Sequence, residues 1–596
     1  MNNKSTLYLL NNLWAHIPIK RKSQLFGLLS FSILASIVEI FNIGLVFPFL
    51  GAFTSPEKIF EIKFLKPIFY KFNILNPSEI LFPMTILFVV AAIFSSVTRL
   101  LMLSMQSRFS YSIGADISIS CYRNMLYSPY LTIVSKNTSE YITGMVDKNR
   151  MIVTQVILPV LSIMSASIIF VAIFITLLVI NPFIALSATF AFSSAYVLLL
   201  FLIKKRLIIH SQDISRKSNQ LIQNLQEGFG GIRDVIIDGT QEIYCKIFND
   251  IDVPLRKAES SISIIGQSPR FVIEAFGMIV LALIAFSLSF DQGGIKTAIP
   301  ILGVFALGAH RLLPVLQQIY QGCTSIFGCK TLLKDILFYL NQKLSKDYSL
   351  SNPPLIKFNK SIKLKKLNFR YDKNQPLIIN DFSFTIKKGE IVGFFGDSGS
   401  GKSTLMDIVM RLINAESGEL LIDDKKITSK NYRSWQLHLA HVPQNIFLAD
   451  STITENIAFG TSFADIDHDL VRSCAKQAQI AETIESWPLK YNTLVGERGI
   501  KISGGQKQRI GIARALYKKT DVIIFDEATN ALDIKTESAI MKAILDLDPK
   551  ITILFISHRP ETLKYCTKIV ELKHGMLARQ GSFKEIIGNK NIIMHH

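Results

Sequence analysis

Residues 391–404 read Ile-Val-Gly-Phe-Phe-Gly-Asp-Ser-Gly-Ser-Gly-Lys-Ser-Thr, an apolar run followed by a glycine-rich loop and a lysine. The apolar run predicts a buried strand, and the pattern from Leu405 onward predicts a helix. A glycine-rich loop between a strand and a helix lets backbone N–H groups wrap phosphates at the positive end of the helix dipole. Lys402 would reach the β- and γ-phosphates, and Ser403 would offer its hydroxyl to Mg²⁺. The stretch therefore predicts an ATP site formed by Gly396, Asp397, Ser398, Gly399, Ser400, Gly401, Lys402, Ser403 and Thr404.

A second apolar run, residues 522–525, ends in the adjacent carboxylates Asp526 and Glu527. A strand of this kind delivers its first carboxylate to the Mg²⁺ and its second toward the attacking water. A general base must lie within hydrogen-bond reach of that water, which a position next to the metal ligand permits. We therefore expect Asp526 to bind Mg²⁺ and Glu527 to act as the base.

The 596 residues are too many for one domain, and the chain is unusually apolar, with 49% hydrophobic residues and a mean hydropathy of +0.32. The apolar residues concentrate before about residue 336, in runs of roughly 20 residues that are long enough to span a bilayer. We predict a transmembrane domain over residues 1–350 and an α/β nucleotide-binding domain over 355–590, joined by a linker at 351–354.

Six membrane-spanning helices are expected, and basic clusters at residues 20–22 and 204–206 flank two of them. By the positive-inside rule these clusters lie in the cytoplasm, together with the nucleotide domain. The first apolar run is too long for a signal peptide, so we interpret it as a retained helix of an inner-membrane protein. The polar stretches 106–150 and 204–268 have helical charge spacing and would extend the helices into the cytoplasm. The expected spans are 24–52, 80–105, 152–179, 183–203, 269–290 and 297–323.

The formal net charge of +19 could indicate nucleic acid as a partner. Basic residues beside membrane helices explain much of this charge, and attraction to anionic lipid is a second use. We therefore expect membrane lipid and no nucleic acid. The six cysteines are scattered without CxxC or Cys/His clusters, which favours free thiols over disulfides or zinc sites.

The motifs together resemble the ATP-binding cassette (ABC) transporter family over nearly the full length of the chain. Residues 502–506, Ile-Ser-Gly-Gly-Gln, are similar to the family signature, with isoleucine in place of the usual leucine. The motifs also stand in the family order. That order is the P-loop, Gln444, the signature, Asp526-Glu527, Asp533 and His558.

The resemblance implies a role for each matching position. Tyr371 would stack on adenine. Gln444 would contact Mg²⁺ and sense the membrane domain, and His558 would hold the γ-phosphate and the water. Asp533 would lie in a loop at the dimer contact. The signature would address the ATP bound by the opposite subunit through Ser503, Gly504, Gly505 and Gln506.

One cassette and six spans make half a transporter. A site that combines the P-loop of one cassette with the signature of another needs two copies, and the simplest assembly is a C2 homodimer. ATP would close the two cassettes and hydrolysis would release them, switching the transport cavity between the two faces of the membrane.

Several charged residues fall inside the expected spans, where they are costly and functional by default. The candidate cavity residues are Glu39, Arg99, Arg270 and Arg311. Guanidinium groups match the oxygens of a phosphate or pyrophosphate. Two alternatives stay open: Arg270 and Glu274, four residues apart, could neutralise each other on one helix face, and Arg99 could extend to the membrane interface.

Short matches in the membrane domain resemble flippases of lipid-linked oligosaccharides: residues 37–39 with 45–49, residues 269–277, and residues 311–314. This resemblance implies that a polyprenyl-pyrophosphate-linked glycan moves from the cytoplasmic to the outer leaflet. It also implies an external helix that engages the lipid tail, for which residues 57–72 have suitable apolar spacing. The alternatives are an exporter of drugs, peptides or simple lipids, and an ATP-gated channel or regulatory subunit.

Overall fold

A computed structural model of the chain describes residues 5–54, 56–60, 76–135, 137–180, 182–288, 294–342, 356–528, 533–546 and 548–588. The chain divides into two compact units. The first, a helical unit, comprises Met1–Ser128 and Val134–Lys343. The second, a mixed α/β unit, comprises Leu344–His596 and the short segment Pro129–Ile133.

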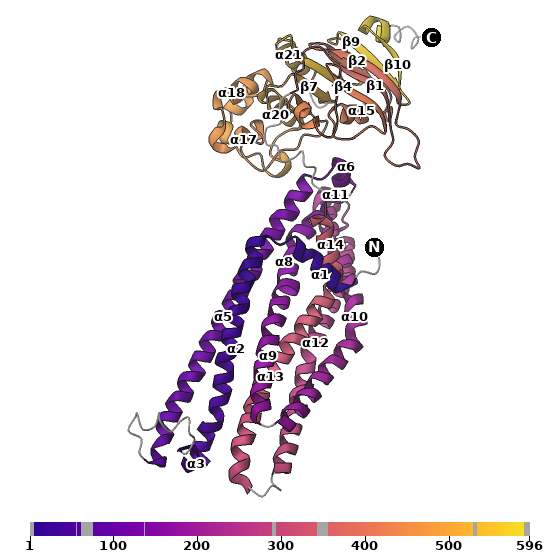
Figure 1. Cartoon of the computed structure of the whole chain (residues 1–596). Helices are drawn as coiled ribbons and strands as arrows, with labels where there is room; N and C mark the ends of the chain where they lie inside the picture. Colours follow the sequence, from indigo (N-terminus) through magenta and orange to yellow (C-terminus); the bar gives the residue numbers. More distant parts are fainter. Residues whose placement is uncertain are drawn as a thin grey trace. The chain divides into compact units, whose positions relative to one another are not determined.

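Long helices make up most of the helical unit (Figure 1). The shorter ones are α1 (Thr6–Ala15), α3 (Pro56–Phe60), η1 (Pro77–Ile80), α7 (Thr138–Thr143), α8 (Asn149–Ile152), α11 (Ile232–Ile237) and α14 (Lys330–Leu340), with π-helical turns η2 (Gly144–Lys148) and η3 (Val153–Ile157) on either side of α8. The long ones are α2 (Ile19–Thr54), α5 (Leu81–Leu126), α9 (Leu158–Ile180), α10 (Pro182–Gly230), α12 (Gln241–Leu288) and α13 (Gly294–Gly328).

Among the described residues, three helical segments are long and apolar enough to cross a membrane: Ile19–Phe53, Leu81–Leu126 and Thr138–Val179. The first and third contain the predicted spans 24–52 and 152–179, and the second contains all of the predicted span 80–105 except residue 80. The other three fall on α10, α12 and α13, and their membrane crossing stays a prediction. The predicted helical continuation of the polar stretches is confirmed, because α5 runs to Leu126 and α10 runs to Gly230.

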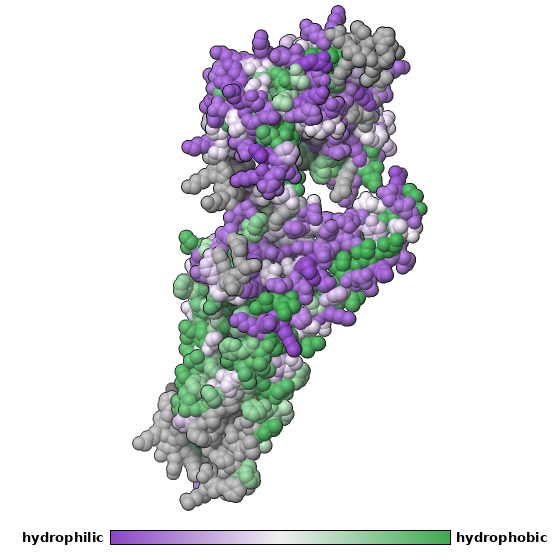
Figure 2. Space-filling view, turned by 90° about the vertical axis from the view of Figure 1, so that its right-hand side faces the viewer, coloured by the Kyte–Doolittle hydropathy of each residue, from purple (hydrophilic) through white to green (hydrophobic). Residues whose placement is uncertain are grey.

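Figure 2 shows how hydropathy divides the helical unit: one half is mostly hydrophobic, and the half that carries the end of α10 and the start of α12 is mostly hydrophilic. The predicted breaks in the polar stretches lead into short helices, α6 (Tyr130–Val134) and α11. Of the external helix predicted over 57–72, α3 covers the first residues, and residues 61–75 lie outside the described part of the chain.

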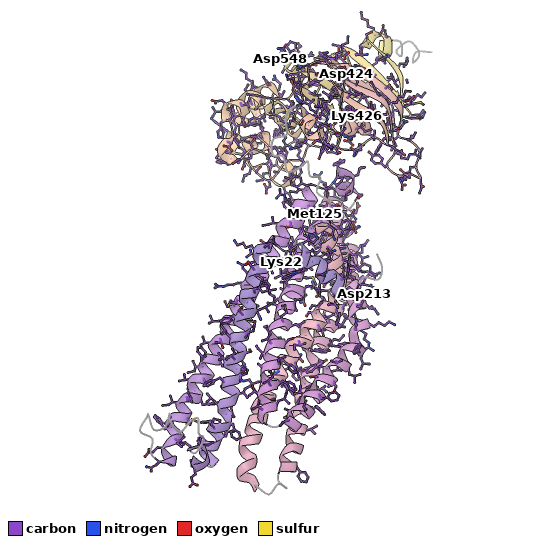
Figure 3. All side chains as sticks on the ribbon, in the orientation of Figure 1. Lys22, Met125, Asp213, Asp424, Lys426 and Asp548 are labelled. Atoms are coloured by element: carbon purple, nitrogen blue, oxygen red, sulfur yellow. The ribbon has the colours of Figure 1, made fainter. Side chains whose placement is uncertain are left out.

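The α/β unit contains two sheets. An antiparallel sheet has the order β2-β1-β4-β5, and a larger, mostly parallel sheet has the order β10-β9-β3-β8-β7-β6. Asp424 lies in the turn between β4 and β5 and Lys426 lies in β5, and both residues are labelled in Figure 3. The strands are β1 (Ser361–Phe369), β2 (Ile379–Lys387), β3 (Ile391–Phe395), β4 (Ser417–Ile422), β5 (Lys425–Lys426), β6 (Leu439–Val442), β7 (Val522–Asp526), β8 (Thr552–Ile556), β9 (Lys568–Lys573) and β10 (Met576–Gly581).

Helices pack on these sheets through two large clusters of buried aliphatic and aromatic side chains. Strands β3, β7 and β8 are parallel neighbours, with Ile391 opposite Ile553 and Asp526 opposite Ile556. Their carboxyl ends therefore meet at one edge, where open α/β sheets bind ligands. The helices are α15 (Lys402–Val409), α16 (Tyr432–Gln436), α17 (Ile453–Ile457), α18 (His468–Gln477), α19 (Ala481–Glu485), α20 (Gly504–Tyr517), α21 (Ile534–Leu545) and α22 (Pro560–Leu563), with short turns η5 (Phe463–Asp465), η6 (Lys490–Asn492), η7 (Glu497–Gly499) and η8 (Lys584–Gly588).

Candidate nucleotide-binding site

The glycine-rich loop joins β3 to α15 in a conformation that requires its glycines. Gly396 and Gly401 have φ angles of 151° and 99°. A Cβ atom would lie 2.3 Å from the carbonyl oxygen of Leu572 at position 396, and 2.9 Å from that of Ile378 at position 401. A side chain at either position would push these carbonyl groups away. Only glycine therefore lets the loop pack this closely against its neighbours.

Lys402 is the first residue of α15, and its ammonium lies inside the loop. Its Nζ donates to the carbonyl oxygens of Gly396 (2.9 Å) and Asp397 (2.8 Å) and lies 3.3 Å from the Ser400 hydroxyl. Burial lowers the pKa of Lys402, and the carboxylates of Glu527, Asp397 and Asp526 act in the opposite direction. A cation and backbone N–H groups thus converge at a helix N-terminus, which fits a chain of phosphates.

The two carboxylates at the end of β7 have different surroundings. Asp526 accepts a hydrogen bond from the Ser403 hydroxyl, and burial, with a smaller contribution from Glu527, raises the pKa of Asp526. A bound cation would offset that electrostatic cost. The oxygens of Ser403 and Asp526 are the hard ligands that Mg²⁺ prefers, so the residues present fit the predicted ion.

Glu527 lies between two of the other predicted catalytic residues. The Gln444 amide donates to one carboxylate oxygen at 2.8 Å, and Nε2 of His558 lies 3.1 Å from the other. Glu527 has a φ of 48°, an uncommon conformation for a residue with a side chain, and its N–H donates to Ile556 at 3.0 Å. Such conformations cluster at active sites because the surrounding structure must hold them in place.

The predicted adenine-stacking residue, Tyr371, is beside the P-loop helix. Its hydroxyl lies 3.3 Å from the Thr404 hydroxyl, and its ring packs edge-on against Phe369 with 5.0 Å between centroids. The side chain is about half exposed, which leaves ring surface for a base to cover. Stacking on adenine stays a prediction.

The signature residues lie at the start of a different helix. Ser503 is the N-cap of α20, where its hydroxyl accepts from the Gln506 N–H and its own N–H donates to the Gln506 side chain. Ser503 and Gly504 are exposed. Asp533 is also exposed and caps α21 by accepting from Thr536. Within the described part of the unit, no hydrogen bond given by the structure joins these residues to the P-loop.

Arg514 is a residue that the sequence analysis missed. It extends from α20 and donates to the carbonyl oxygens of Asn456 and Phe447, both at 2.8 Å, while its guanidinium lies 4.7 Å from the centroid of the Phe459 ring. Burial lowers the pKa of Arg514 to about 10. It therefore ties the signature helix to the segment after Gln444. The sequence signal that could have identified Arg514 is the presence of an arginine among the apolar residues of α20.

Asp407, on α15, was also missed, and its environment leads to a testable pH dependence. Burial, with a contribution from Asp526, raises the pKa of Asp407 to about 6. The folded protein thus holds this proton over a pH range in which the unfolded chain has lost it. Stability therefore falls as pH rises through this range and stays reduced above it.

We expect Asp407→Asn to increase protection of α15 against amide hydrogen exchange in the full-length protein at pH 8. The pKa of Asp407 is raised by about two units, each worth about 1.4 kcal/mol, so the gain should be on the order of 3 kcal/mol. The gain should shrink as pH falls toward 4, since Asp407 of the wild type is then protonated. Asp548→Asn, at an exposed position, is the control. An equal gain at all pH values would contradict the assignment.

The candidate cavity residues of the helical unit form two groups. Glu39 is 3% exposed and accepts from Arg99 Nη2 at 2.5 Å and from the Ser95 hydroxyl at 3.0 Å, while Nε of Arg311 lies 3.5 Å away. This Glu39 cluster links α2, α5 and α13. Arg270 is separate from it and pairs with Glu274 on α12 at 2.7 Å, as the four-residue spacing allowed.

Comparisons with known proteins agree with this geometry. Residues 379–530 match the family model "ABC transporter". The chain is 31% identical over 395 residues to the ATP-dependent lipid A-core flippase of Francisella tularensis subsp. holarctica. It is 37% identical over 259 residues to a protein named for multidrug export in Staphylococcus aureus, covering 43% of this chain and 44% of that protein. The match to the flippase covers 63% of the length of each protein.

The structure of a bacterial Atm1-family ABC exporter with ATP bound superposes with a TM-score of 0.77 at 21% identity, over 96% of this chain and 97% of that one. This likeness shows that the two proteins share a fold. It confirms the predicted class, a helical membrane bundle fused to an α/β nucleotide domain. Residues 379–530 therefore form an ABC transporter domain, in a chain that shares the fold of an ABC exporter.

Proposed function

We propose that the protein hydrolyses ATP to drive export or flipping of an amphipathic lipid across the inner membrane. The single observation that carries the ATPase is the position of Glu527, whose carboxylate is held by Gln444 and His558 at the edge where the P-loop ends. The wider prediction rests on the family and on relatives that include a flippase.

Each polar group at this edge has a task in hydrolysis. Glu527 would take the proton of the attacking water, and His558 would hold the water and the γ-phosphate in place. Lys402 would bind the β- and γ-phosphates. Mg²⁺, held by Ser403, Asp526 and Gln444, would neutralise charge on the phosphates. The base must lie within hydrogen-bond reach of the water. The carboxyl ends of β3, β7 and β8 meet at one sheet edge, which brings Glu527 close to the P-loop.

The active form we propose is a homodimer. Ser503 and Gly504 are exposed at the start of α20, so a second copy could present its signature to the P-loop of the first. A C2 pair then has two equivalent composite sites. Glu527 and His558 are both retained, which supports two working sites in such a pair.

As cargo we propose a polyprenyl-pyrophosphate-linked oligosaccharide, moved from the cytoplasmic to the outer leaflet. One relative is named as an ATP-dependent flippase of lipid A-core. In the Glu39 cluster the guanidinium groups of Arg99 and Arg311 share one carboxylate. The cluster therefore has a net positive charge that could bind the pyrophosphate of the lipid head.

A drug exporter is the second candidate, supported by the relative named for multidrug export. That match covers less of the chain than the match to the flippase. Drug export predicts stimulation of the ATPase by unrelated apolar compounds and little effect of losing Arg311.

The test is flipping of a radiolabelled polyprenyl-pyrophosphate oligosaccharide in proteoliposomes with ATP. We expect Arg311→Ala to lower flipping at least ten-fold and to leave the basal ATPase within about two-fold, since loss of one charged contact costs on the order of 2 kcal/mol. The matched control is Arg216→Ala, which removes an exposed arginine of α10 near Asp213. Equal loss of flipping and ATPase would indicate a packing role for Arg311. Absence of flipping by an active wild-type ATPase would overturn the cargo.

A further inference from the structure

The helical unit contains a cavity of about 460 Å³ that the nucleotide site does not use. We call it the polar cavity. Its walls come from α10, α12 and α13 with the turns around α8 and the start of α14. Nine of the 19 lining residues have hydroxyl or amide side chains, set among aliphatic residues such as Ile214, Ile262 and Leu332. The nine include Ser211, Ser215 and Ser218 of α10, Ser263 and Gln267 of α12, and Gln321 of α13.

The charges around the polar cavity leave no cation for a phosphate. Lys148 is the one basic residue among the described residues that line it. Its ammonium is buried and bonds to Asp335 at 2.6 Å, and Asp335 also accepts from Ser215 at 3.0 Å. The other charged residues of the lining are the acids Asp147 and Glu259. Arg150 and Arg256 lie 3.9 and 3.1 Å from these two acids, so the cavity suits an uncharged ligand rich in hydrogen-bonding groups.

A smaller cavity of about 220 Å³ adjoins it, since Gln321 lines both. This second cavity contains the ion pair of Arg270 and Glu274 together with Gln317, whose side chain accepts from the Tyr196 hydroxyl at 2.9 Å. Glutamine side chains thus connect the smaller cavity, which contains the Arg270 guanidinium, with the polar cavity, whose described lining has no unpaired cation. The two pockets differ in the ligand chemistry that they can accept.

The polar cavity also lies at a definite level of the predicted bilayer. Its α10 residues follow the end of the predicted span 183–203, and its α12 residues precede the predicted span 269–290. This is the cytoplasmic end of the spans, the level at which a lipid of the cytoplasmic leaflet carries its head. Its volume lies within the range of about 300–1,000 Å³ that ligand pockets usually have.

We infer that the polar cavity binds sugar residues of the lipid head before transport. This inference rests on the proposed function and assigns to it a site for the glycan. Each sugar hydroxyl both donates and accepts, which matches serine hydroxyls and glutamine amides, and carboxylates such as Asp147 and Glu259 accept from pairs of hydroxyls. A site built from such groups discriminates strongly against a ligand that leaves them unpaired.

Thiol protection tests the site directly. Ser263→Cys places a reporter in the polar cavity, and Ser260→Cys places one on the same helix outside it, both in full-length protein carrying Cys245→Ser to remove an exposed thiol. Maleimide labelling is followed with two probes: a polyprenyl-pyrophosphate oligosaccharide and the same polyprenyl pyrophosphate without sugar. At ten times the half-saturating concentration, the glycosylated lipid should slow labelling at 263 about ten-fold. The bare lipid should not, and labelling at 260 should be unchanged by either once Cys329, a native thiol that lines the cavity, is also replaced by serine.

Flipping of the glycosylated lipid by wild-type protein is measured in parallel, so that the two proposals can fail separately. Flipping without protection at 263, or equal protection by both lipids, would overturn the sugar site and leave the flippase standing. Protection by the glycosylated lipid without flipping would support the sugar site and overturn the transport step. If protection and flipping were both absent, the sugar site and the flippase would both be overturned.

Discussion

Glu527→Gln is expected to lower ATP turnover by about 10²–10⁴-fold while the protein still binds ATP, because general base catalysis contributes a factor of this size. The amide keeps the shape of the carboxylate and retains one oxygen to accept from Gln444, which donates to Glu527 at 2.8 Å. It cannot accept a proton from water. Phosphate release under saturating ATP measures turnover, and equilibrium binding of a fluorescent ATP analogue measures affinity.

Glu561→Gln is the matched control for this prediction. Glu561 lies on α22, three residues after His558, and is exposed. Its neutralisation should leave turnover within about two-fold of the wild type, since exposed charges contribute little. Turnover near the wild-type rate in Glu527→Gln would remove Glu527 as the base. Loss of ATP affinity together with turnover would instead indicate that the variant disturbs the P-loop.

Glu39→Gln is expected to destabilise the helical unit by about 1–3 kcal/mol, because Glu39 is buried while its partners Arg99 and Arg311 are 43% and 22% exposed. Glu39 is 3% exposed, and it accepts from Arg99 while Arg311 lies 3.5 Å away. Without its carboxylate, two guanidinium groups would face each other in a bundle without a counter-ion. Amide hydrogen exchange of α2, α5 and α13 in lipid nanodiscs measures the loss.

The matched control is Glu274→Gln, which breaks the pair with Arg270 on α12. Arg270 is 61% and Glu274 42% exposed, so breaking this pair should cost much less than the loss of the Glu39 carboxylate. The double variant Glu39→Gln with Arg311→Gln should recover part of the stability, because it removes one of the two unpaired charges. Equal effects of the two single variants would contradict the role given to Glu39.

The chemistry of the nucleotide site was readable from the chain because its parts are local. The P-loop needs a strand, glycines with φ angles such as 99° at Gly401 and a helix that begins at Lys402, all within 391–404. These requirements act between near neighbours, so they leave a pattern in the sequence. The long helices were predictable for the same reason, since apolar length and helical spacing are properties of a single segment.

Contacts between distant segments were not readable in this way. Arg514 and Asp407 escaped notice because burial depends on what packs against α20 and α15. The sequence left open whether the charged residues of the predicted spans were partners. Only the packing of the helices joins Arg99 and Arg311 at Glu39 while it leaves Arg270 with Glu274.

The sequence by itself therefore determined the type of each unit, the motif that binds phosphate and the identity of the acidic residues beside it. Only the tertiary structure decided that Gln444 and His558 hold Glu527, and that serines and glutamines of three helices enclose one polar cavity. The physical reason is that a local conformation is set by neighbouring residues. A site between elements depends instead on the register of strands and the packing of helices, whose free energy is spread over many contacts far apart in the chain.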